Sequence, residues 1–137
     1  MNWVAVDLGA STIKASVLDK SNKPVRLSYP MGDYATTLLS SVVVVTEDKK
    51  VIMGDYASQL GVSNPNMRVY DWVHSVHKSL IAKAIFETIK QAYVRHYNDS
   101  NIGIVLLYNN IVDPELKGIA TNVFSEVKTM QSGEVIK

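Results

Sequence analysis

The chain has 137 residues, a formal net charge of +1 and no cysteine, and 47% of its residues are hydrophobic. This length suits one domain with a sizeable core, and the near-neutral charge gives no electrostatic case for binding nucleic acid or an anionic membrane. Without cysteine there are no disulfides or thiolate metal sites, and no apolar run approaches the ~18 residues of a membrane span. Because no signal peptide is recognisable, we expect a cytoplasmic protein.

The first stretch, residues 3–18, reads as two strands joined by a short loop. Residues 3–6 and 13–18 are mostly apolar and rich in strand formers. Gly9 permits a tight turn and the close approach of a ligand, and successive backbone N–H groups in such a turn bind anions. Asp7, at the exit of the first strand, would hold a hydrated Mg²⁺ ion on bound phosphates. From the residues alone, an ordinary hairpin with an exposed acid is an equally good interpretation of this stretch.

Apolar runs and turn residues predict the remaining strands, with residues 30–41 as a loop. We expect strands at residues 25–29, 42–45, 51–53, 102–108 and 127–130.

Helices are expected at residues 54–62, over most of 71–97, and from Asp113 onward. In the long segment, apolar residues recur at three- and four-residue steps, and Lys83, Lys90 and Arg95 are among the polar residues on the opposite, solvated side. Asp113 is the expected N-cap of the last helix, followed by a proline and a second acid. His74 and His77 could pair as metal ligands, but ordinary surface or core histidines are the favoured interpretation.

The sequence VDLGAST, which contains Asp7, resembles the first phosphate loop of the actin-like ATPase superfamily. Members of that superfamily open with a strand ending in Asp-x-Gly, a hydroxyl-rich turn and a second strand. The rest of the chain is similar to the first lobe of the ATPase domain of the seventy-kilodalton heat-shock (DnaK-type) chaperones. This similarity rests on Thr36-Thr37 and Ser41-Val42-Val43, like the family's TTPSVV, and on Gly54, Ala57, Asn64-Pro65 and Val69-Tyr70, like its G-x-x-A…NP…[VI]F pattern.

The resemblance implies an α/β fold: a ribonuclease-H-like (actin-like ATPase) mixed sheet with flanking helices and a small hairpin subdomain. Residues 1–137 would be the N-terminal lobe alone, a truncated piece of a longer product. ATP and Mg²⁺ are the implied cofactors, both bound only weakly by this piece, with the ion held through water by Asp7. The implied phosphate contacts are the backbone of Gly9, Ala10 and Ser11 and the hydroxyls of Ser11 and Thr12, while Lys14 would face either the phosphates or solvent.

Departures from the family pattern limit the expected activity. The two threonines of the family's phosphate loop fall on Ala10 and Ser11, and its catalytic lysine falls on Val73, with Lys78 the nearest lysine. The second phosphate loop, the adenosine pocket and the second lobe would lie beyond Lys137. We therefore expect no catalytic residue in this chain, and ATPase activity at most in a longer parent.

The expected function is that of a nucleotide-binding half-domain of a DnaK-like chaperone, inactive in isolation. Its expected partners are nucleotide and a second lobe or another protein chain, including a second copy of itself, but neither nucleic acid nor a membrane. Two alternatives stay open. One is an actin-like scaffold or a pilus- or division-type assembly protein; the other is a pseudo-ATPase interaction module, which Val73 favours.

Overall fold

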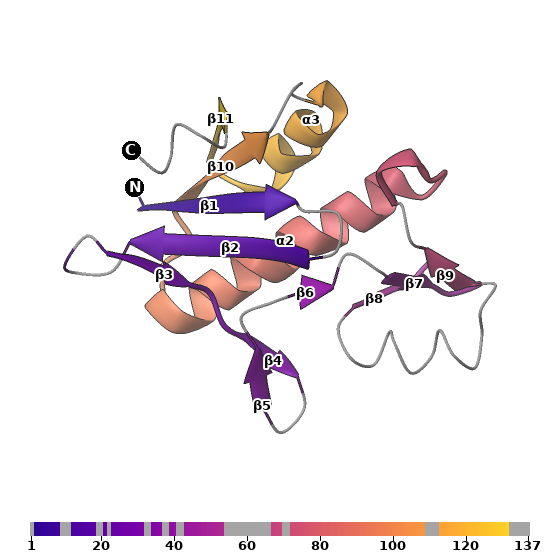
Figure 1. The fold of residues 1–137 in the computed structure, drawn as a ribbon, viewed down its shortest axis with the longest axis horizontal. Helices are drawn as coiled ribbons and strands as arrows, with labels where there is room; N and C mark the ends of the chain where they lie inside the picture. Colours follow the sequence, from indigo (N-terminus) through magenta and orange to yellow (C-terminus); the bar gives the residue numbers. More distant parts are fainter. Residues whose placement is uncertain are drawn as a thin grey trace.

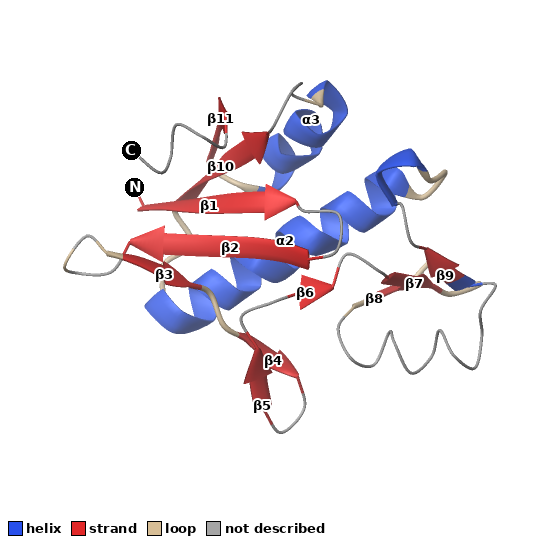
Figure 2. Ribbon diagram, in the orientation of Figure 1, coloured by secondary structure: helices blue, strands red, loops and turns tan. Residues whose placement is uncertain are grey.

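The computed structural model describes most of the chain as a mixed α/β fold, with a main sheet, two smaller sheets and two α-helices (Figures 1 and 2). The helix expected at residues 54–62 lies outside the described residues. The residues that the structure describes are 2–8, 12–18, 21, 23–31, 34–36, 39–40, 43–53, 67–69, 72–108 and 113–131.

The main sheet follows the path β11–β10–β1–β2–β3, and β6 also pairs with β2. Strand β1 is parallel to β10, and β10 is parallel to β11, whereas β1–β2 and β2–β3 are antiparallel. The N-terminal strand is therefore flanked by its hairpin partner on one side and by a strand about a hundred residues later on the other (Figure 1). The strands are β1 (Asn2–Leu8), β2 (Thr12–Leu18), β3 (Pro24–Arg26), β6 (Leu39–Ser40), β10 (Ile102–Tyr108) and β11 (Glu126–Gln131).

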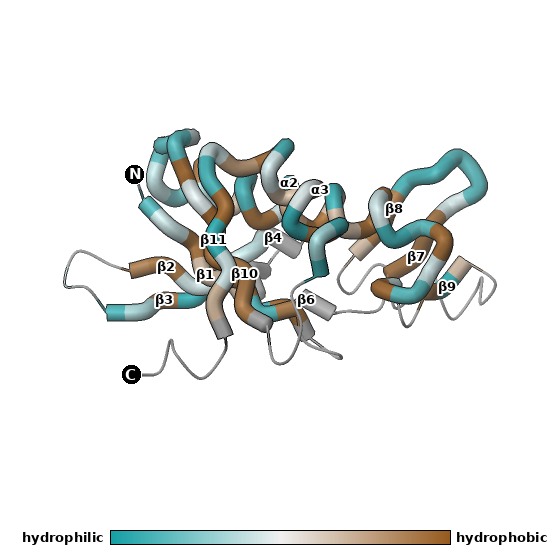
Figure 3. The backbone as a smooth tube through the Cα atoms, turned by 90° about the horizontal axis from the view of Figure 1, so that it is seen from above, coloured by the Kyte–Doolittle hydropathy of each residue, from teal (hydrophilic) through white to brown (hydrophobic). Residues whose placement is uncertain are grey.

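The core lies on one face of this sheet. Since side chains alternate along a strand, β1 places Val4 and Val6 on this face and β10 places Ile104 there, all fully buried. They pack in one cluster with buried residues of α2 (Lys78–Tyr97) and α3 (Pro114–Val123). Figure 3, turned by 90° from Figure 1, shows both helices on the same side of the sheet.

The two helices begin and end where the sequence provides caps. Asp113 caps α3 with its side chain, and the proline at the first helical position has no N–H to leave unpaired. Helix α2 ends at Asn98, which takes the left-handed conformation (φ 51°) and donates its N–H to the Val94 carbonyl. In the described part of the chain, neither helix combines the length and apolarity that crossing a bilayer requires.

Several predicted strands are confirmed, and one region is corrected. The third strand ends at Arg26 instead of residue 29: Leu27 still donates its N–H to the Ala15 carbonyl of β2, and the chain then leaves the main sheet to form another strand from Tyr29. Residues expected to form a loop instead make the hairpin β4 (Tyr29–Met31) with β5 (Tyr34–Thr36). The buried strand predicted at residues 42–45 is β7 (Val43–Val45), which pairs with β8 (Val51–Ile52) and with β9 (Arg68–Val69), a strand that was not predicted.

Candidate functional site

The carboxyl end of β1 carries the residue expected to hold the metal ion. Asp7 is half-buried and is the penultimate residue of the strand. In register it lies opposite Lys14 on β2 and beside Leu107 on β10. The strand ends at Leu8, which pairs with Ile13 of β2, so Asp7 lies at the end of the strand, as the sequence predicted.

The expected phosphate contacts fall largely outside what the structure describes. Gly9, Ala10 and Ser11 lie outside the described residues, and for Thr12 only the backbone is described, paired with Ser40 of β6. Lys14 is exposed, which is compatible with both of its expected roles, facing the phosphates or facing solvent. The phosphate roles of these residues remain predictions.

Val73, which the resemblance places at the expected lysine position, lies in the 3-10 helix Trp72–His74 that precedes α2. It is half-buried and packs against the core beside the buried ring of Trp72. An aliphatic side chain in this place can fill space but cannot bind a phosphate oxygen.

The order of the strands gathers several chain segments at one edge of the sheet. Because β1, β10 and β11 are parallel, their carboxyl ends meet at the same edge. The connection from β1 turns back into β2, while that from β10 passes through α3 to β11 on the other side. In open α/β sheets, ligands bind outside the carboxyl ends of strands at a point where the connections diverge in this way.

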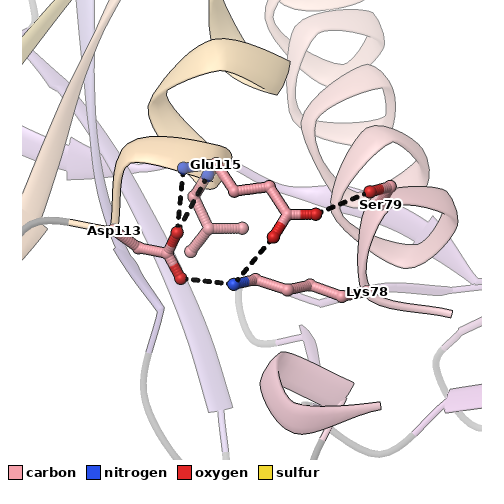
Figure 4. A network of polar contacts seen from close by, with 5 residues as sticks. Lys78, Ser79, Asp113 and Glu115 are labelled. Atoms are coloured by element: carbon pink, nitrogen blue, oxygen red, sulfur yellow. Dashed lines mark hydrogen bonds and ion pairs between the residues drawn. The ribbon is translucent and has the colours of Figure 1, made fainter. Parts of the chain in front are cut away.

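A polar network joins the starts of both helices at this edge (Figure 4). The Lys78 ammonium lies 2.6 Å from Oδ2 of Asp113 and 3.2 Å from Oε2 of Glu115. Ser79 donates its hydroxyl to Oε1 of Glu115 at 2.8 Å. The other Asp113 oxygen accepts the N–H groups of Glu115 at 3.0 Å and of Leu116 at 3.3 Å. One carboxylate thus caps α3 and also holds the first residue of α2.

These contacts keep all three charged groups ionised around neutral pH. Burial by itself raises the pKa of Asp113, but the hydrogen bonds from Lys78 and the helix N–H groups together bring it below its ordinary value. Hydrogen bonds from Ser79 and then Lys78 lower the pKa of Glu115. The hydrogen bond to Asp113 raises the pKa of Lys78. Two of the three N–H donors of the Lys78 ammonium thus point to carboxylates, so its positive charge is already paired.

The sequence predicted Asp113 as a helix cap and noted Lys78 as the nearest lysine, but did not predict that they pair. Each starts a helix, and a helix that precedes or follows a parallel strand in this topology begins at the strands' carboxyl edge. That order of elements is the signal that would have predicted the pair.

The histidine pair has no support as a metal site. His74 is exposed, and His77 stands at the start of α2. Among the residues that the structure describes, no cluster of three or more His, Cys, Asp or Glu side chains could hold a metal ion. A shallow hollow on α2, lined by Lys90, Gln91, Val94 and Arg95, lies toward the other end of that helix from Lys78.

Comparison of the sequence with models of known protein families and with curated proteins finds no match.

Proposed function

We propose that this chain is the first lobe of an actin-like ATPase domain, closest to the DnaK-type chaperones. In this proposal the 9–12 turn binds the phosphates of ATP, and Asp7 holds Mg²⁺ through water. A second lobe, in the same protein or in another chain, would close over the nucleotide. The lobe alone binds ATP weakly and does not hydrolyse it.

The main support for the proposal is the order and direction of the strands in the main sheet. An antiparallel β1–β2–β3 meander is followed by two parallel strands, β10 and β11, on the other side of β1. This is the strand arrangement expected of a ribonuclease-H-like sheet. It puts the β1–β2 turn and Asp7 at the edge where α3 also begins. The N-terminus of a helix favours bound anions, because its first N–H groups point outward.

A second candidate, a module that binds a partner or nucleotide without turnover, is favoured by two observations at the same edge. The family's lysine position holds the packed side chain of Val73. The nearest lysine, Lys78, is already paired with two carboxylates. The two candidates share the phosphate site and differ in hydrolysis. An actin-like assembly protein would use the same site to regulate association.

The expected affinity follows from the few contacts that one loop can make. Hydrogen bonds to a charged phosphate contribute about 1.5–3 kcal/mol each, so two or three give roughly 3–9 kcal/mol. Association alone costs about 4–15 kcal/mol. We therefore expect a Kd of about 1 mM or weaker for the 137-residue chain. Hydrolysis should be undetectable, because nothing excludes water or aligns the attacking group.

Titration of the isotope-labelled chain with MgATP, followed by amide NMR shifts, tests the proposal. Shifts should be largest around residues 7–14, and Asp7→Asn should remove their dependence on Mg²⁺. Glu126→Gln, the same carboxylate-to-amide change on exposed β11, is the matched control and should leave the shifts unchanged. Micromolar affinity, or shifts centred elsewhere, would contradict the proposal.

Adding the second lobe separates the two candidates. If a longer protein or an added partner lobe binds ATP tightly and turns it over, the ATPase assignment holds. Tight binding without turnover favours the non-hydrolysing module, and Val73→Lys should then raise the rate.

A further inference from the structure

The face of the main sheet opposite the helices has a composition of its own. Alternation places on it the residues that lie between the buried core positions of each strand. At its centre, Trp3 and Ala5 of β1 and Val105 and Leu107 of β10 form an apolar strip, and all four are half-buried. Among the described residues, α2 and α3 both pack on the other face.

The indole of Trp3 lies flat across the neighbouring strand. A Cβ atom added to Gly103, its register partner on β10, would come within 2.6 Å of the Trp3 ring, so the ring covers that backbone directly. The Lys128 ammonium, from β11, lies 4.4 Å from the centre of the Trp3 ring. The ring thus forms a flat end to the strip, with the Lys128 ammonium lying over it.

Parallel strands usually have both faces covered by helices. Strands β1, β10 and β11 are parallel, and the apolar strip lies on the first two of them. A helix is the cover that suits it, because helices pack nearly along the strands and present an apolar stripe of matching width.

The charges beside the strip indicate which kind of helix would suit it. Lys14 on β2 and Lys128 on β11 are exposed and border the strip on its two sides. Arg26 lies further out on β3, next to Ser16. The acids are placed differently: Asp7 lies at the carboxyl end of the strip, and Glu126 lies beside Gly103 at the opposite end.

A second copy of the chain fits this face poorly. A two-fold axis running between β1 and β10, along the centre of the strip, would lay β11 of one copy over β2 of the other, so that Lys128 faced the strand that carries Lys14. An axis across the strands would bring Lys128 close to Lys128. Either arrangement opposes like charges, which is unfavourable at an interface.

We propose that the apolar strip is the docking site for an amphipathic helix of a different protein chain, with acidic residues on both sides of its apolar stripe. The helix lies along β1 and β10 and places its acids beside Lys14 and Lys128. The strands have seven residues each, so they span about 23 Å, the length of a helix of about 15 residues.

The test uses the whole chain and two labelled helical peptides of about 15 residues. Both carry the same leucine and alanine stripe; one has glutamates on both flanks and the other has lysines. Fluorescence anisotropy should show saturable binding of the glutamate peptide and at least about tenfold weaker binding of the lysine peptide. The double variant Lys14→Glu/Lys128→Glu should reverse this preference. Both lysines are exposed, so the variant should fold.

Lys83→Glu/Lys117→Glu is the matched control, with the same change of charge at exposed positions of α2 and α3. It should bind both peptides as the wild type does. The proposal is wrong if the wild type binds neither peptide, or if the control variant reverses the preference as strongly as the test variant. It is also wrong if sedimentation shows a dimer that the glutamate peptide dissociates, since a second copy would then be the native occupant of the face.

Discussion

Replacing Asp113 separates the two contributions that its carboxylate makes at the start of α3. One oxygen caps the helix, and the loss of a cap costs about 1 kcal/mol. The other binds Lys78 at 2.6 Å, with 18% of the Lys78 side chain and 27% of the Asp113 side chain exposed. An accessible pair of this kind contributes up to about 1 kcal/mol. Asp113→Ala should therefore lower the free energy of unfolding by about 2 kcal/mol, and Asp113→Asn, which retains the cap, by about 1 kcal/mol.

Urea unfolding followed by circular dichroism measures both variants. A urea slope of about 1–3 kcal/mol per molar turns a loss of about 2 kcal/mol into a midpoint shift of roughly 1 M. The pKa of Asp113 is lowered in the folded state, so the pair stabilises the protein above about pH 4 and this contribution is lost as the pH falls through the lowered pKa. The stability difference between wild type and Asp113→Asn should shrink below pH 4. Equal losses in the alanine and asparagine variants, or additive costs for Asp113→Asn and Lys78→Met, would refute the reasoning.

Three further changes test the packing. The buried Tyr29 hydroxyl has no hydrogen-bond partner among the described residues, and burial raises its pKa to about 12. Tyr29→Phe should therefore raise the free energy of unfolding by about 1 kcal/mol. Because that pKa is raised, the wild type should also lose stability between pH 10 and 12, and the Tyr29→Phe variant should lose less stability over this range. A variant less stable than the wild type at pH 7 would mean that the hydroxyl has a hydrogen-bond partner. Gly103→Ala should cost about 1–2 kcal/mol by displacing the indole, and almost nothing in a Trp3→Ala background; an equal cost in both backgrounds would exclude this clash. Lys90 donates to the last carbonyl of α3 at 2.9 Å, so Lys90→Met should cost about 1 kcal/mol in urea unfolding, whereas Lys83→Met at an exposed position of the same helix should cost little.

The sequence predicted the long elements well, because they repeat their pattern often enough to be recognised. The bounds of β10 were predicted as the structure has them, and those of β1, β2 and β11 to within two residues. The hairpin of β4 and β5 was missed for the opposite reason. Three residues per strand are too few to show an alternation, and Pro30 within β4 argues against a strand.

The sequence predicted only those features of the site that depend on residues close together in the chain. Asp7 before a turn can be recognised in seven residues, whereas the bond between Lys78 and Asp113 joins positions 35 apart and depends on how two helices meet. Lys90 shows a second limit. Periodicity placed it on the solvated side, but it is half-buried, and its long aliphatic stem carries the ammonium to the end of α3.

The parallel pairing of β1 with β10 has a consequence for how the chain folds. Asn2 pairs with Ile102, so the first strand cannot form its parallel pairing until a strand a hundred residues later has been synthesised. Its hairpin with β2 can form early, because it closes over a few residues. Until β10 emerges from the ribosome, however, the other edge of β1 and the apolar side chains of Val4 and Val6 lack their native neighbours. Folding should therefore be limited by this one long-range closure, and the nascent chain is most prone to aggregate before it occurs.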